Sequence, residues 1–174
     1  LEALQVITAK NPLPFITGTI CAHHCMDKCM RNHYECPVNI RGTKLQAAEG
    51  AFEELLAITE MSREGEKVAI IGGGPAGLAA AYHAQKHGLQ ATVFEKRETL
   101  GGIVRNVIPG FRIGDDAIDN DIALIKKTGA EFVMGKEAPD VKELKAMGFD
   151  YIVLACGAEK KGRLNIEGSV MNVI

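Results

Sequence analysis

Apolar residues in the second half of the chain form short runs that alternate with stretches of helical spacing. The short runs predict strands at residues 68–71, 91–94, 131–134 and 151–155. Between them, a small-residue stretch after Gly77, residues 116–127 and residues 141–146 predict helices. Because strands and helices alternate along the chain, we expect a parallel sheet with helices on both of its faces.

The chain begins with a different pattern. Residues 1–10 predict a short amphipathic helix with Leu4, Val6 and Ile7 on its apolar side. The following Asn11-Pro12-Leu13-Pro14 should stop this helix, because neither proline supplies an amide hydrogen.

A cysteine-bearing stretch and a long helix are expected next. Residues 17–37 keep no regular period, whereas residues 45–61 repeat apolar side chains at helical spacing and predict one long helix. The polar linker 62–66 then marks the expected domain boundary. The sequence therefore predicts a small helical domain, residues 1–64, before an α/β domain, residues 65–174.

A glycine fingerprint follows the first predicted strand of the α/β domain. Gly72, Gly74 and Gly77 stand in the spacing G-x-G-x-x-G. The first glycine permits a tight turn, the second lets the backbone approach a diphosphate, and the third lets the next helix pack closely on the strand. The diphosphate would lie at the helix N-terminus, where free amide hydrogens and the helix dipole favour negative charge. This order of elements predicts a dinucleotide-binding site.

An acidic residue stands where a ribose would lie. Glu95 ends the second predicted strand, eighteen residues after Gly77, and Gly101-Gly102 follow it. A carboxylate in this place can accept hydrogen bonds from both hydroxyls of an adenosine ribose and disfavours a 2′-phosphate, so the site should not prefer NADP. A glycine turn that only packs a helix against a strand is the structural alternative. The agreement of the strand, turn, helix, acidic residue and second glycine pair favours the dinucleotide.

Length and composition narrow the class of protein. The chain has 174 residues, of which 47% are hydrophobic and 24% charged, and its net charge is −2. Such a chain can form one domain with a small appendage, and it offers no basic face for nucleic acid. No apolar run is long enough for a membrane span and no signal peptide is visible, so we expect a cytoplasmic protein. The ends at Leu1 and Ile174 lead us to expect a piece of a longer protein.

Four of the five cysteines stand close together. They are Cys21, Cys25, Cys29 and Cys36, all within sixteen residues. In a cytosolic protein such a group indicates a metal or iron–sulfur site more often than a set of disulfides. The first three can surround one centre and Cys36 can approach as a fourth thiolate, as a [4Fe–4S] cluster requires.

Zinc is the main alternative metal. His23, His24 and His33 lie in the same segment, and cysteine and histidine together form tetrahedral zinc sites. Each histidine taken alone is more typical of a surface residue than of a ligand. The fifth cysteine, Cys156, ends an apolar strand and is expected to be a small buried side chain.

Taken together, the ordered motifs resemble one protein family. They are Asn11-Pro12-Leu13-Pro14, the cysteines, Pro37-Val38-Asn39-Ile40, the glycine fingerprint, Glu95-x5-Gly101-Gly102 and Ile108-Pro109-Gly110-Phe111-Arg112. The family is that of the glutamate synthase small subunit and the N-terminal half of dihydropyrimidine dehydrogenase. In style the chain is most similar to large iron–sulfur flavoproteins described as selenate reductase subunits. The resemblance spans nearly the whole chain.

The resemblance implies a fold, a set of cofactors and their contacts. In that family a helical iron–sulfur domain precedes an FAD domain, an NADPH-binding domain is inserted into the FAD domain, and electrons pass from NADPH through FAD to the clusters. The fold would therefore be α/β, with a truncated Rossmann-like FAD-binding domain behind a small α-helical cysteine-rich domain. The residues that would wrap the FAD diphosphate are Gly72, Gly74, Pro75, Ala76, Gly77 and Leu78.

Further contacts follow from the same resemblance. Glu95 and Lys96 would hold the adenosine ribose and its surroundings. The segment Leu100, Gly101, Gly102 and Ile103 would approach the ribityl and flavin part. Arg112 would reach the cofactor from its loop, with a surface ion pair as the structural alternative.

Departures from the family pattern limit what this chain could do alone. Thr17 stands where the family commonly has a cysteine, and the interval from Cys21 to Cys25 is shorter than usual, so Cys36 would be a replacement ligand. The family's other cysteines lie upstream of position 1, and the chain ends before any second glycine fingerprint and before the NAD(P)H-binding domain. We therefore expect no NADPH oxidation by the chain alone. It should work with the remaining domains of a longer protein or a catalytic partner subunit; homo-oligomerisation stays open.

Three functions compete for this sequence. The first is an electron-transfer module of an NAD(P)H-dependent FAD and iron–sulfur oxidoreductase. The second, from another class, is a zinc-stabilised non-catalytic interaction module with a vestigial nucleotide fold. The third is an NAD-dependent dehydrogenase that would use the same fingerprint and Glu95, although no catalytic histidine, tyrosine–lysine pair or zinc constellation follows in the expected region.

Overall fold

The computed structural model describes residues 1–61 and 64–158. Its described strands form one parallel sheet in the order β3-β2-β1-β4. The strands are β1 (Lys67–Ile71), β2 (Gln90–Glu95), β3 (Glu131–Met134) and β4 (Tyr151–Leu154). After β1 the chain forms β2 and β3 on one side of β1, and it then crosses back to form β4 on the other side of β1. The carboxyl ends of β1 and β4 therefore enclose the crevice where open parallel sheets bind ligands.

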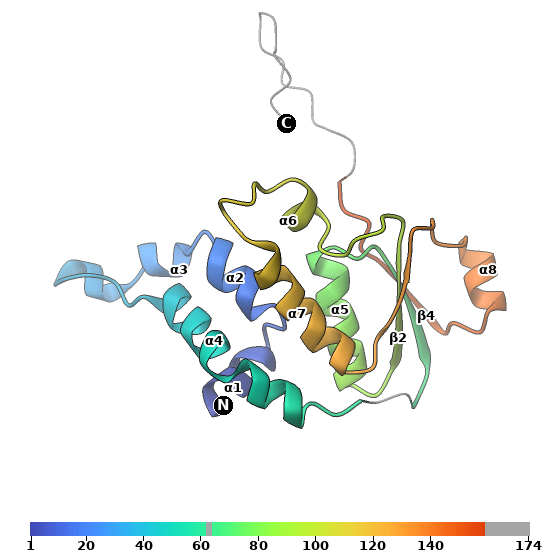
Figure 1. Ribbon diagram of the computed structural model, residues 1–174, viewed down its shortest axis with the longest axis horizontal. Helices are drawn as coiled ribbons and strands as arrows, with labels where there is room; N and C mark the ends of the chain where they lie inside the picture. The colour runs from blue at the N-terminus through green and yellow to red at the C-terminus, as the bar shows by residue number, and fades with distance from the viewer. Residues whose placement is uncertain (62–63, 159–174) are drawn as a thin grey trace, which may run out of the picture.

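Helices cover both faces of the sheet, as the alternating pattern predicts (Figure 1). The helices α5 (Pro75–Lys86) and α7 (Asp115–Lys127) lie on one face, and α8 (Val141–Ala146) lies on the other. Side chains alternate accordingly: Ile70 belongs to the core under α5 and α7, whereas Ala69 and Phe94 pack with Leu144 of α8. The predicted α/β fold is confirmed.

The first part of the chain is helical. It contains α1 (Glu2–Thr8), α2 (Pro14–Ile20), α3 (His24–Asp27), a 3-10 helix η1 (Met30–His33) and α4 (Ile40–Ile58). A further short helix, α6 (Ile103–Asn106), lies in the α/β part. Across residues 1–61 and 64–158, no helix combines the length and apolarity that a membrane span requires.

The helical part corrects two details of the predictions and adds one helix. Val6 is 73% exposed and does not belong to the apolar side of α1. The first helix ends at Thr8, before the predicted stop at residues 11–14, and Pro14 begins the additional helix α2, because the first turn of a helix does not need the amide hydrogen that proline lacks. The long helix starts at Ile40 instead of residue 45, and Asn39 caps it by accepting a hydrogen bond from the amide of Gly42 at 3.0 Å.

The helical part and the α/β part share one apolar core. Phe15 of α2 and Phe52 of α4 pack edge to face, with ring centroids 5.0 Å apart. Both belong to the same buried cluster as Ile122 and Leu124 of α7. The predicted domain boundary crosses residues 62–63, which lie outside the described residues, so the division at residue 64 stays a prediction.

Candidate functional site

The glycine fingerprint forms the turn between β1 and α5. Gly72 has a φ of +111°, which side chains rarely adopt, and a Cβ there would overlap the carbonyl oxygen of Ala155 just after β4. A Cβ at Gly77 would overlap the carbonyl oxygen of Gly72. The fold itself therefore requires these two glycines, and the chain after β4 passes directly beside the turn.

Gly74 differs from the other two fingerprint glycines. It is the N-cap residue of α5, and its φ of −78° is accessible to any residue. Among the described residues, a Cβ there would meet just the Cα of Gly102, at an ordinary contact distance of 3.7 Å. Packing against the described residues does not explain this glycine. Its missing side chain leaves the N-terminus of α5 open, where the first-turn amides of a helix lack partners inside the helix.

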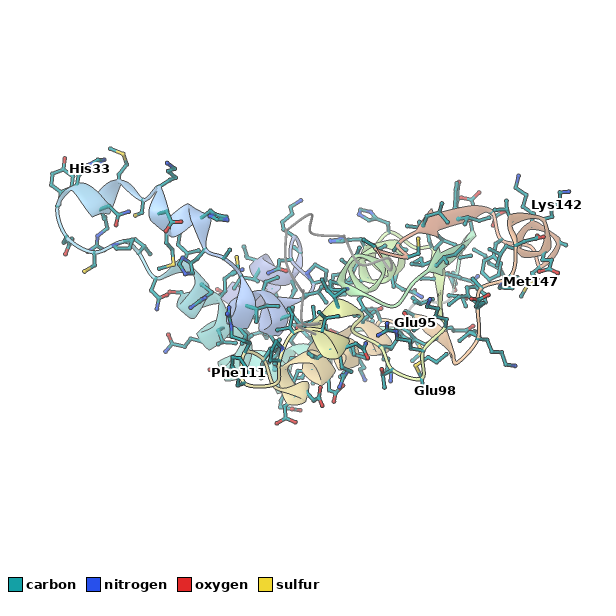
Figure 2. The ribbon with its side chains drawn as sticks, turned by 90° about the horizontal axis from the view of Figure 1, so that it is seen from above. His33, Glu95, Glu98, Phe111, Lys142 and Met147 are labelled. Carbon is teal, nitrogen blue, oxygen red and sulfur yellow. The ribbon has the colours of Figure 1, made fainter. Side chains whose placement is uncertain are left out.

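The predicted acidic residue lies beside this turn. Glu95 ends β2 and is 7% exposed (Figure 2). Its Oε2 accepts a hydrogen bond from the amide of Gly73 at 2.7 Å, and its Oε1 accepts one from the amide of Arg97 at 2.9 Å. An ionised carboxylate has about four acceptor positions. The two backbone bonds fix the side chain and leave capacity for the hydroxyls of a ligand.

A second glycine-containing segment closes on the same turn. The amide of Gly101 donates to the carbonyl oxygen of Gly73 at 2.8 Å. Gly102 has a φ of +55°, and a Cβ there would lie 2.7 Å from the Cα of Gly74. Leu100 is buried, whereas Ile103 is 60% exposed. The structure thus brings the predicted segments 72–78 and 100–103 together with Glu95.

The two other predicted contact residues are Lys96 and Arg112. Lys96 follows Glu95 directly at the end of β2. The backbone amide of Arg112 donates to the carbonyl oxygen of Pro109 at 2.8 Å, and the Arg112 residue is exposed on this loop. The contact of Arg112 with a cofactor stays a prediction, and a surface ion pair stays its structural alternative.

Sequence reasoning missed an arginine that holds the glycine segment in place. The Arg105 side chain is 16% exposed, and its Nε donates to the carbonyl oxygen of Leu100 at 2.8 Å. Its Nη1 lies 2.8 Å from the Oδ1 of Asp115, and its Nη2 pairs with Asp119. Both carboxylates belong to α7. Arg105 therefore ties the segment beside the candidate site to that helix.

A buried aspartate was also missed. Asp121 of α7 is fully buried, and its carboxylate accepts hydrogen bonds from the amides of Phe15 at 3.1 Å and Ile16 at 2.8 Å. Burial raises the pKa of Asp121 to about 7, although the amide hydrogen bonds act in the opposite direction. In the sequence it looks like one more polar residue of an amphipathic helix, because its partners lie more than a hundred residues away.

The four clustered cysteines lie on a projecting segment, residues 21–37, which we call the cysteine arm (Figure 1). Figure 2 shows His33 at its tip, at the opposite end of the molecule from Lys142 of α8. None of the residues 21–37 is buried. Within the part of the chain that the structure describes, no three cysteine, histidine or acidic side chains gather into a metal-binding group. The four-thiolate ligand set therefore stays a prediction.

One cysteine of the arm has a distinctive environment. Backbone hydrogen bonds from Val38 and Arg31, together with the Arg31 charge, lower the pKa of the Cys29 thiol. A lower pKa favours the thiolate, which is the form that binds metals. By contrast, Cys156 is exposed, so its predicted burial was wrong. It lies just past β4, an edge strand of the described sheet whose Leu154 is 72% exposed.

The glycine turn, the acidic end of β2 and the parallel sheet define a Rossmann-like nucleotide-binding unit. The family model of the NAD(P)-binding Rossmann-like domain matches residues 70–142 of the chain. This match spans the turn, Glu95 and the glycine segment that closes on them.

Nearly the whole chain is similar to parts of longer proteins. It is 38% identical to the protein YgfK of Escherichia coli (strain K12), over 99% of this chain and 17% of that protein. It is 33% identical to the glutamate synthase (NADPH) small chain of Bacillus subtilis (strain 168), over 96% of this chain and 35% of that protein. It is 32% identical to the NADPH-Fe(3+) oxidoreductase subunit beta of Geobacter sulfurreducens (strain ATCC 51573 / DSM 12127 / PCA), over 96% and 26%.

These matches confirm the resemblance that the ordered motifs indicate. The chain spans between 17% and 35% of the length of these three relatives. The similarity therefore concerns the cysteine arm, the helices around it and the nucleotide-binding unit, and not the rest of the longer proteins.

Proposed function

We propose that the chain is the dinucleotide-binding and cysteine-bearing module of an NAD(P)H-dependent FAD and iron–sulfur oxidoreductase, in which electrons pass from NAD(P)H through FAD to a [4Fe–4S] cluster. The observation that carries this proposal is the open position at Gly74. The fold requires Gly72 and Gly77 but not Gly74, so a ligand that approaches the backbone explains the glycine at position 74. Two relatives are named as an NADPH glutamate synthase chain and an NADPH-Fe(3+) oxidoreductase subunit, which supports the class.

In this proposal each segment of the turn has a defined task. The amides of the first turn of α5 bind the diphosphate, with Pro75, Ala76 and Leu78 shaping that turn. Glu95 accepts the ribose hydroxyls and, as a carboxylate, repels a 2′-phosphate. The backbone of Gly101 and Gly102 lies next to Gly74 and borders the path that a longer ligand would follow beyond the ribose.

This continuation past the ribose favours FAD over NAD at this site. FAD bound there would supply hydride acceptance and one-electron transfer, which are the chemistry of the cofactor itself. The chain binds and orients the group, and we assign no catalytic residue to it. NAD(P)H would bind to a domain outside this chain, and the terminal acceptor would lie on other domains or on a partner subunit.

The cysteine arm would supply the second cofactor site. Its four thiolates, Cys21, Cys25, Cys29 and Cys36, are the donor set that a [4Fe–4S] cluster requires. Amide hydrogen bonds such as those at Cys29 are one of the means by which proteins tune such clusters. Because the arm buries no side chain, the bound metal would supply much of its folding free energy.

Cofactor analysis of the full-length protein tests the proposal. After anaerobic purification we expect bound FAD together with about four irons and four labile sulfides for each cluster. Elemental analysis separates the main alternative, since stoichiometric zinc without iron or flavin would identify the non-catalytic interaction module. A protein that contains neither flavin nor iron after reconstitution would contradict the proposal.

A further inference from the structure

Asp121 lies outside both candidate cofactor sites, yet it is fully buried. Its helix, α7, lies between α2 and α5 (Figure 1). Its two oxygens each accept a hydrogen bond from a different backbone amide of α2, those of Phe15 and Ile16. Burying a carboxylate is costly, and well-packed apolar residues often stabilise a core equally well or better. The two hydrogen bonds therefore suggest a role in fixing geometry.

The helix that Asp121 holds leads directly to the cysteine arm. The α2 helix is seven residues long, and its C-cap residue is Cys21, the first predicted cluster ligand. The amide of Cys21 donates to the carbonyl oxygen of Thr17 at 3.3 Å. A pair of hydrogen bonds at Phe15 and Ile16 limits rotation and sliding of α2 more strictly than apolar packing alone.

The same helix α7 is also tied to the dinucleotide site. Arg105 links the carbonyl oxygen of Leu100 to Asp115 and Asp119, which lie in the first half of α7. The neighbouring Gly101 donates to Gly73 in the glycine turn. A continuous set of hydrogen bonds and ion pairs thus runs from the turn to α7, and Asp121 extends it to α2.

We propose that Asp121 is a positioning residue that fixes the cysteine arm relative to the dinucleotide site, with α7 as their common support. This inference rests on the proposed function for its electron-transfer consequence. The rate at which an electron moves between two cofactors depends on their separation and orientation. A small shift of α2 would displace Cys21 while leaving the glycine turn, Glu95 and the bound dinucleotide in place.

The test compares Asp121→Ala and Asp121→Asn with the control Asp116→Asn in the full-length protein. Asp116 is an exposed carboxylate on the same helix. We expect unchanged FAD content in all three variants. In Asp121→Ala the rate of cluster reduction after flavin reduction, measured by anaerobic stopped flow, should fall severalfold, because electron tunnelling slows exponentially as the separation of the two cofactors grows. Asn keeps one acceptor oxygen and should recover part of the rate. A rate in Asp121→Ala equal to that of wild type would overturn the inference.

Hydrogen exchange separates this inference from the proposed function. Amides of residues 15–21 should exchange faster than in wild type in Asp121→Ala, by a smaller factor in Asp121→Asn, and at the wild-type rate in Asp116→Asn, while β1 keeps its protection. If the wild-type protein contained no FAD or iron, the proposed function would fail, and this exchange pattern would still decide whether Asp121 fixes α2. If Asp121→Ala does not fold, Asp121→Asn decides: wild-type exchange at residues 15–21 overturns the inference, and faster exchange supports it.

Discussion

Ile70, Leu78 and Leu124 of the α/β part are fully buried, whereas no side chain of the cysteine arm is. The strands and helices of the α/β part bury their apolar side chains against one another. The arm instead exposes Met30 and Tyr34, at 70% and 86%. The first region therefore holds its shape by packing, and the second lacks that source of stability.

This difference indicates what each region needs. A segment without buried apolar surface cannot offset the conformational entropy lost on ordering, unless a ligand or partner contributes binding free energy. Four thiols on such a segment fit a metal centre, because metal binding and folding share one free energy. The nucleotide turn is different, since its backbone is already shaped by Gly72, Gly77 and the core beneath them.

The largest expected difference is in stability. Leu124→Ala should lower the free energy of unfolding by about 2–5 kcal/mol, because it creates a cavity in the shared core. Met30→Ala in the arm should change it by less than about 0.5 kcal/mol, because its side chain is exposed. Chemical denaturation of both variants measures these values. Comparable losses would show that the arm is packed as tightly as the α/β part.

A second difference should appear in the pH dependence of stability. Burial raises the pKa of Asp121 to about 7, from 3.8 for an ordinary aspartate. Between these values the folded protein holds a proton that the unfolded chain has released. The contribution of Asp121 to the free energy of unfolding therefore falls as the pH rises from about 4 to about 7 and is constant above that range. Asp121→Asn should remove this slope. The measurement is the free energy of unfolding of both proteins, determined by chemical denaturation at several pH values over that range, and the same pH dependence in both proteins would contradict the prediction.

The smallest expected effect on the α/β part comes from a substitution in the cysteine arm. Cys29→Ser should lower the iron and labile sulfide content of the full-length protein, since the thiolate of Cys29 is a predicted ligand. The FAD content should not change, because the arm contributes no residue to the glycine turn. Cys156→Ser is the matched control for the iron site, and it should keep its iron and labile sulfide. Full iron content in Cys29→Ser would remove that residue from the ligand set.

The sequence predicted the α/β part well because its signals are local. Apolar runs and helical spacing placed β3 and α8 with the bounds that the structure shows, residues 131–134 and 141–146. The glycine spacing and the acidic residue at the end of the second strand likewise predicted that Glu95 lies beside the turn, and it accepts a hydrogen bond from the amide of Gly73 there. These features depend on neighbours in the chain and on the alternation of a parallel sheet.

The remaining features depend on distant partners and could not be predicted. Asp121 accepts hydrogen bonds from the amides of Phe15 and Ile16, which lie 106 and 105 positions earlier in the chain. Arg105 is held by carboxylates of another helix, α7. The helix α2 was not predicted, because its first residue, Pro14, belongs to the segment that correctly predicted the end of α1, and proline fits both places. The predicted burial of Cys156 failed because the chain just past the edge strand β4 is uncovered in the described structure.

The most direct test of the central claim is FAD binding by Gly74→Val and Gly114→Val in the full-length protein. Both glycines are N-cap residues with a φ of −78°, and a Cβ at either position meets no close contact in the described structure. Both variants should therefore fold with a similar small cost. We predict that Gly74→Val weakens FAD binding at least about tenfold, or 1.4 kcal/mol, and that Gly114→Val binds as wild type does. Wild-type affinity in Gly74→Val, or a wild-type protein that stays colourless with excess FAD, would contradict the account.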